Sequence, residues 1–118
     1  MQILNLTQHI TTPEQISAGV VEPIDKKEVQ ELLTFIFPPT LKQMEFRAAR
    51  LAQIALENNC NIAMLGGAPY FMSSIELALV AEKIMYMYSF SERVSVESTN
   101  EDGSIVKTNV FKHTGWVY

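Results

Sequence analysis

Polar residues that could bind a small ligand occur in three short stretches, each near the expected end of a strand. The first stretch is Thr7-Gln8-His9, the second is Gly66–Tyr70, and the third runs from Ser89 to Arg93. Because parallel strands end at one edge of a sheet, where α/β proteins bind ligands, we expect the three stretches to converge. The candidate ligand-binding residues are Thr7, Gln8, His9, Gly66, Gly67, Ala68, Pro69, Tyr70, Ser89, Ser91, Glu92 and Arg93.

Three side chains in this set indicate the kind of chemistry. His9 could act as a general acid or base near neutral pH. Arg93 could hold a phosphate through two parallel hydrogen bonds, and Tyr70 could stack on a base. We therefore predict a small nucleotide ligand, with His9 and Arg93 as the catalytic candidates. In the simpler interpretation His9 has a structural role, and Glu92 and Arg93 form a solvated ion pair.

The glycine pair has the local pattern of a strand, a tight turn and a helix start. The apolar run Ile62–Leu65 is typical of a buried parallel strand, and Gly66-Gly67 lets the backbone approach a ligand closely. The free N–H groups of the following helix would favour a negatively charged ligand such as phosphate. The pattern lacks the third glycine of a dinucleotide site and the Gly-Lys of a P-loop, and a turn that binds nothing can look the same.

The sequence offers no pattern for a metal or a resident cofactor. His9, His113 and Cys60 do not lie at metal-ligand spacing, and the candidate site contributes a single carboxylate, Glu92. We therefore predict no metal and no cofactor. Cys60 fits a buried packing residue better than a nucleophile.

Composition narrows the class of partner. A formal net charge of −4 and an isoelectric point near 5.1 argue against binding to long nucleic acid. The chain lacks an apolar run long enough to span a membrane, and we expect no signal peptide, because Met1 leads into an expected strand and not into a basic segment with an apolar core. Together with a single cysteine, these features predict a cytoplasmic protein. Its 118 residues suit one domain, spanning residues 1–118.

Apolar periodicity and capping residues predict the elements that position these side chains. Helices are expected to begin after Thr12, Asp25 and Thr40, each a good N-cap. The predicted strands cover residues 2–6, 62–65 and 85–90, and the predicted helices cover residues 13–18, 26–34, 41–58 and 71–83.

The C-terminal third predicts an antiparallel hairpin. Alternating residues at 94–99 and 105–110 flank a turn at 100–104 that contains Asp102-Gly103. The aromatic tail 111–118 is expected to pack on the sheet or against another subunit. The fold class that follows is α/β: a three-layer Rossmann-like domain with a short parallel sheet and a C-terminal antiparallel hairpin.

Three stretches also resemble a known family. Leu4–His9 followed by Thr12-Pro13-Glu14-Gln15, the turn Met64–Tyr70 and the strand Tyr88–Arg93 are similar to small stand-alone CRISPR-associated Rossmann-like proteins. Some of those proteins bind or cleave cyclic oligoadenylate, and similar ones serve phages as counter-defence proteins. The resemblance implies a homodimer with the ligand across its two-fold axis, and metal-free cleavage in which a 2′-hydroxyl of the ligand attacks the neighbouring phosphate.

Two other functions are compatible with the sequence. A protein-interaction module could act through the hairpin and the aromatic tail. A nucleoside or nucleotide hydrolase could use Glu92 or Glu97 as its nucleophile or base.

Overall fold

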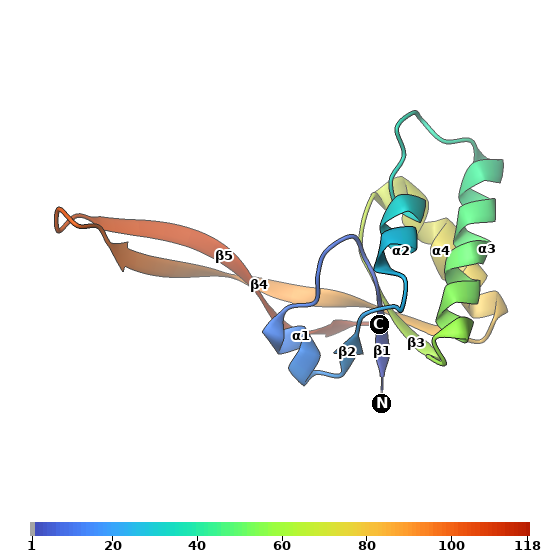
Figure 1. The fold of residues 1–118 in the computed structure, drawn as a ribbon, viewed down its shortest axis with the longest axis horizontal. Coiled ribbons are helices and arrows are strands. Elements are labelled where there is room, and N and C mark those ends of the chain that lie inside the picture. The colour runs from blue at the N-terminus through green and yellow to red at the C-terminus, as the bar shows by residue number, and fades with distance from the viewer. Residues whose placement is uncertain (1) are drawn as a thin grey trace.

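The computed structural model describes residues 2–118, and Met1 lies outside the described residues (Figure 1). Five strands and four helices follow one another within residues 2–118. They are β1 (Ile3–Leu6), α1 (Pro13–Ser17), β2 (Val20–Val21), α2 (Lys26–Leu32), α3 (Leu41–Glu57), β3 (Ile62–Leu65), α4 (Pro69–Ala81), β4 (Met85–Thr99) and β5 (Ile105–Val117).

The strands form one mixed sheet in the order β2-β1-β3-β4-β5. The first four strands are mutually parallel, and β5 runs antiparallel to β4. The expected α/β class, with a parallel sheet and a C-terminal antiparallel hairpin, is confirmed. The two-residue strand β2 was not predicted; Val20 and Val21 pair with Ile3 and Leu4 beside β1.

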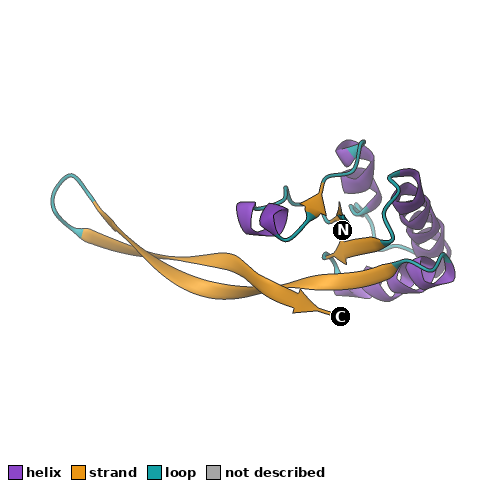
Figure 2. Cartoon of the chain, turned by 90° about the horizontal axis from the view of Figure 1, so that it is seen from below, coloured by secondary structure: helices purple, strands orange, loops and turns teal. Residues whose placement is uncertain are grey.

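The two faces of the sheet are covered differently. Helices α2, α3 and α4 lie together on one face, where Leu4, Leu51 and Phe71 belong to the main hydrophobic core (Figure 2). The other face has a smaller cluster, which includes Met64 and Met87, with Trp116 packed against it. In the part of the chain that the structure describes, α1 is the helix near this second face.

Local capping explains where the helices begin. Thr12 with Gln15, and Thr40 with Gln43, form the two-way capping boxes that satisfy first-turn N–H groups. Asp25 caps α2. Helix α4 begins at Pro69, two residues earlier than predicted, because proline is well suited to the first helical position. No helix among residues 2–118 is both long and apolar enough to cross a membrane.

The strand predicted at 85–90 continues without a break into the first strand of the hairpin. Its expected end at Ser91–Arg93 was wrong, because β5 supplies hydrogen-bonding partners along β4 as far as Thr99. Residues 111–117 of the tail belong to β5, which pairs with β4 at the edge of the sheet, for example Trp116 with Ser89.

Beyond the body of the sheet, β4 and β5 project as a two-stranded arm made of residues 92–112 (Figure 1). The molecule is 55 Å long, and its radius of gyration is 16.7 Å. A compact chain of this length would have a radius of gyration of about 13 Å. The arm therefore makes the molecule elongated.

Candidate functional site

A cavity of about 420 Å³ lies where β1, β3 and β4 end or pass the edge of the sheet. The chain continues from β1 to β2 on one side and later returns to β3 on the other, so the strand order reverses between β1 and β3. Open α/β sheets bind their ligands at such a switch point. Six predicted site residues line the cavity: Thr7, His9, Gly66, Gly67, Ser89 and Ser91.

Three other predicted residues lie close by in the chain but outside the lining. The Gln8 side chain turns away and donates a hydrogen bond to Thr34 Oγ1. Ala68 is the N-cap of α4, and Pro69 is its first residue.

The remaining three predicted residues, Tyr70, Glu92 and Arg93, are not part of the cavity lining. Because α4 starts at Pro69, Tyr70 lies in its first turn, and its ring packs 6.2 Å from the ring of Phe35. Glu92 lies opposite Lys112 in the ladder of the arm. The Arg93 guanidinium lies 5.5 Å from the centre of the Phe111 ring, and Phe111 lines the cavity, so Arg93 lies beside the cavity without lining it. Both residues fall outside the lining because β4 continues past the edge of the sheet.

The loop after β1 is fixed by a buried amide. The Asn5 side chain is fully buried, and its Nδ2 is within hydrogen-bonding distance of the His9 carbonyl, Thr11 Oγ1 and Glu22 Oε1. Its Oδ1 accepts hydrogen bonds from the N–H and the hydroxyl of Thr7. These contacts hold Thr7 and His9 at the mouth of the cavity. This role was not predicted from the sequence, although an isolated Asn in an otherwise aliphatic strand is a recognisable signal.

Lys26 holds the same loop from α2. Its ammonium donates to the Thr7 carbonyl at 2.6 Å and to the His9 carbonyl at 3.0 Å, and it lies 3.5 Å from Glu22. Burial lowers the pKa of Lys26, and the nearby Glu22 carboxylate partly offsets this effect. The loop is thus attached to both the sheet and α2, which makes it a rigid wall for a site.

The floor of the cavity holds a hydroxyl and imidazole pair. His113 Nδ1 lies 2.5 Å from Ser89 Oγ, and the imidazole is buried against the Trp116 ring at a centroid distance of 4.5 Å. Gln15 donates a hydrogen bond of 3.4 Å to the same hydroxyl from α1. A hydroxyl beside an imidazole can pass a proton to it, as a general base requires. His113 was not predicted to belong to the site, because its approach to Ser89 depends on the register of β5.

The glycine turn and the start of α4 form the opposite wall. Gly67 has a φ of +152°, which L side chains rarely adopt, and a Cβ at Gly66 would lie 3.3 Å from Thr7 Cγ2. The N-cap Ala68 supplies no side-chain acceptor to the first turn of α4. Glycine therefore keeps this wall open next to a helix end that favours anions.

Tyr88 connects the cavity to the helix layer and gives a pH-dependent prediction. Its hydroxyl donates a hydrogen bond of 2.6 Å to Glu76 on α4, and burial together with this carboxylate raises the pKa of the phenol. The neutral phenol thus stabilises the folded state fully below the unfolded pKa of about 10, and this contribution is lost as pH rises toward the folded pKa. Replacing Tyr88 with Phe is expected to lower the free energy of unfolding by about 1 kcal/mol at pH 7.

The difference between wild type and Y88F should shrink above about pH 10. Urea unfolding at a series of pH values measures this difference in the free energy of unfolding. Y86F is the matched control, since Tyr86 is the neighbouring tyrosine on the same face of β4. An equal alkaline loss of stability in the wild type and in Y88F would contradict the assignment.

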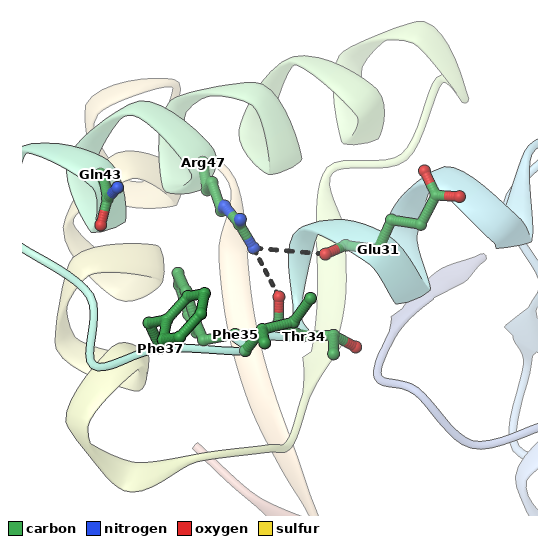
Figure 3. Close-up of a pocket in the computed structure, with 7 residues that line it drawn as sticks. Glu31, Thr34, Phe35, Phe37, Gln43 and Arg47 are labelled. Carbon is green, nitrogen blue, oxygen red and sulfur yellow. Dashed lines mark hydrogen bonds between the residues drawn. The ribbon is translucent and has the colours of Figure 1, made fainter.

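A second cavity, of about 410 Å³, lies between the C-terminal end of α2 and the start of α3 (Figure 3). The Arg47 guanidinium points into it but donates to the carbonyls of Glu31, Leu32 and Thr34, and it lies 4.4 Å from the centre of the Phe35 ring. Arg47 therefore satisfies the last carbonyls of α2. We assign this cavity a structural role, because its cation is already engaged.

The fold and the cavity together define a mixed α/β protein with a ligand-sized site at the β1/β3 edge. Within this class the chain belongs to the family described as Uncharacterized protein MJ1673 family, which it matches over residues 1–117. No curated protein and no solved structure matches the chain.

Proposed function

We propose that the protein binds a small nucleotide-type signal, in particular a cyclic oligonucleotide, in the cavity between β1, β3 and β4. The observation that carries this proposal is the position of the cavity at the point where the strand order reverses. We also propose that the domain is a reduced Rossmann-like unit, with α1 as its thin third layer, and that it acts in the cytoplasm.

The chemistry of the lining supports a nucleotide. Hydroxyl, amide and imidazole groups, such as those of Thr7, Gln15 and His9, can hydrogen-bond to a base or a ribose. Among residues 2–118, the lining includes no Lys, Arg, Asp or Glu side chain. Phosphate groups would therefore be held by the backbone of the glycine turn and the start of α4.

We also propose that the protein opens the ring of the bound ligand without a metal. The Ser89–His113 pair supports this second step. The ligand's 2′-hydroxyl would give its proton to Ser89 Oγ while Ser89 gives its own to His113 Nδ1. The 2′-oxygen then bonds to phosphorus, the bond from phosphorus to the 5′-oxygen breaks, and the leaving oxygen takes a proton from His9 or from water. The product is a linear oligonucleotide ending in a 2′,3′-cyclic phosphate.

Binding is tested first by thermal shift and mass spectrometry with cyclic oligoadenylates, cyclic dinucleotides and adenine nucleotides. A ligand that binds the folded state at 100 times its Kd adds about 2.7 kcal/mol to its stability. A shift with intact ligand recovered indicates a sensor or a sponge, and a linear product indicates an enzyme. The absence of a shift with every nucleotide would overturn the proposal.

The glycine turn gives a sharper test. G67V is expected to weaken binding at least about tenfold, because a branched side chain strains the turn and crowds the Met72 methyl group, 3.3 Å from an added Cβ. G103V is the matched control, since Gly103 also has a positive φ, of +85°, but lies in open space at the tip of the arm. Equal affinity of folded G67V and G103V, measured by calorimetry, would count against this site.

A protein-interaction function is the second candidate, and the exposure of the arm favours it. Large apolar side chains such as Ile105 and Phe111 are exposed by 64% and 70%. A hydrolase that uses Glu92 or Glu97 has less support, because Glu92 lies outside the cavity lining and Glu97 lies on the arm, 3.7 Å from Lys107.

A further inference from the structure

The projecting arm has two chemically different faces. Neighbouring residues of a strand point to opposite faces, and directly paired residues share a face. One face, which we call the valine face, carries Val94, Val96, Val106, Thr108 and Val110, with Ser98 near the tip and the pair Glu92 and Lys112 at the base. The opposite face carries the polar pairs Ser95 with Asn109 and Glu97 with Lys107, between Phe111 at the base and Ile105 near the tip.

The valine face continues the helix-covered face of the sheet. Tyr88 and Phe90 precede Val94 at alternate positions of β4, and Tyr88 packs against the main core. Past Tyr88 no helix of the described chain covers this face, and Phe90 is 53% exposed. Val96, Val106 and Val110 are exposed by 46%, 41% and 42%.

An uncovered arm of this kind is unfavourable in water. A two-stranded hairpin alone is marginally stable, and an apolar stripe on one face adds stability only when something covers it. Valine has a high preference for strands whose side chains pack against another surface. The pattern therefore indicates that a second apolar surface covers the valine face.

We propose that this surface is the valine face of a second copy of the chain, with the two arms packed face to face and antiparallel. The charges along the arm support this choice. The tip carries Glu101 and Asp102. At the base, Lys112 lies opposite Glu92 on the valine face and Arg93 lies on the other face, so two cations stand there against one acid. An antiparallel two-fold arrangement brings each acidic tip over the partner's basic base, whereas a parallel one brings the two acidic tips together.

This arrangement differs from a dimer built around a ligand. The valine face is opposite the face that carries Ser89, Ser91 and His113, since these residues alternate with Phe90 and Glu92 along the ladder. The arms would associate without nucleotide. The tests therefore use the protein alone, and their outcome is independent of the proposed ligand site.

Sedimentation equilibrium of the full chain is the first test, and it is expected to show a dimer at micromolar concentration. V110K is expected to raise the dimer dissociation constant at least about 100-fold, because it places a charge in the apolar contact. N109K is the matched control: it adds the same charge at the next residue but on the polar face, and it should leave the dimer intact. A wild type that stays monomeric at 100 times this concentration, or equal dimerisation of V110K and N109K, would overturn the proposal.

Disulfide trapping keeps the proposal testable if V110K fails to fold. Thr108 lies midway along the arm on the valine face, where the two-fold axis brings it near its copy. T108C is expected to form a cross-linked dimer on mild oxidation, whereas N109C should not; the native Cys60 is buried. Equal cross-linking of T108C and N109C would contradict face-to-face packing.

Charge reversal tests the orientation. K112E should weaken the dimer, because it places an acidic residue where the partner's acidic tip lies. Adding E101K and D102K to the same chain should restore the dimer, because the tip is then basic and the base acidic. Failure of the triple variant to regain dimerisation would exclude the antiparallel arrangement.

Discussion

Replacing Asn5 with leucine is expected to lower the free energy of unfolding by about 3 kcal/mol, because several buried polar groups lose their partner at once. The substitution leaves the N–H and hydroxyl of Thr7, the hydroxyl of Thr11 and the Glu22 carboxylate without the amide that joins them. The melting temperature should fall by about 10 °C for a chain of this size. Urea and thermal unfolding measure both quantities.

The same substitution should release the loop that carries Thr7 and His9, so nucleotide affinity is expected to fall by more than the loss of folded protein explains. N61A is the matched control. Asn61 is exposed at the start of β3, and its replacement should change stability by less than about 0.5 kcal/mol. A loss below about 1 kcal/mol for N5L would show that the amide network is not what fixes the loop.

Replacing His113 with asparagine is expected to lower the rate of ring opening at least about 100-fold, since a positioned general base contributes about that much or more. Asparagine keeps an acceptor near Ser89 Oγ but cannot take up a proton. The ligand dissociation constant should change by less than about threefold, because the change concerns a proton-transfer group. Single-turnover product analysis and equilibrium binding separate the two effects.

K112Q serves as the control for this experiment, because Lys112 precedes His113 in β5 but points to the opposite face. H9N tests the exposed imidazole at the cavity mouth, where loss of turnover would identify His9 as the proton donor to the leaving oxygen. Full turnover by folded H113N would remove His113 from the mechanism. If the wild-type protein binds a cyclic nucleotide but never opens its ring, the enzymatic half of the proposal is wrong and the protein only binds.

Local interactions made the helix starts predictable. The N-caps Thr12, Asp25 and Thr40 were identified correctly because each interacts with residues within one turn. The turn at residues 100–104 was predicted for the same reason, and Gly103 there has a φ of +85°. The start of α4 was misplaced by two residues, which made Tyr70 appear to belong to the glycine turn.

Half of the candidate site followed from a general rule about parallel strands. Thr7, Gly66 and Ser89 come together because β1, β3 and β4 are parallel and end or pass the same edge. The strand end expected at Glu92 and Arg93 was wrong because polar residues usually mark the end of a strand, whereas a ribbon with exposed faces tolerates them.

The sequence by itself determined the α/β class, the helix boundaries within a few residues, and the polar residues at two strand ends. These depend on periodicity and on contacts between near neighbours in the chain. Tertiary structure alone decided the strand order, the length of β4 and the entry of His113 into the cavity. That last contact joins residues 24 positions apart, and it depends on the register of β5 and on the irregularity between Phe90 and Ser91. Register is set by pairing across the whole ladder, so no local pattern could have predicted it.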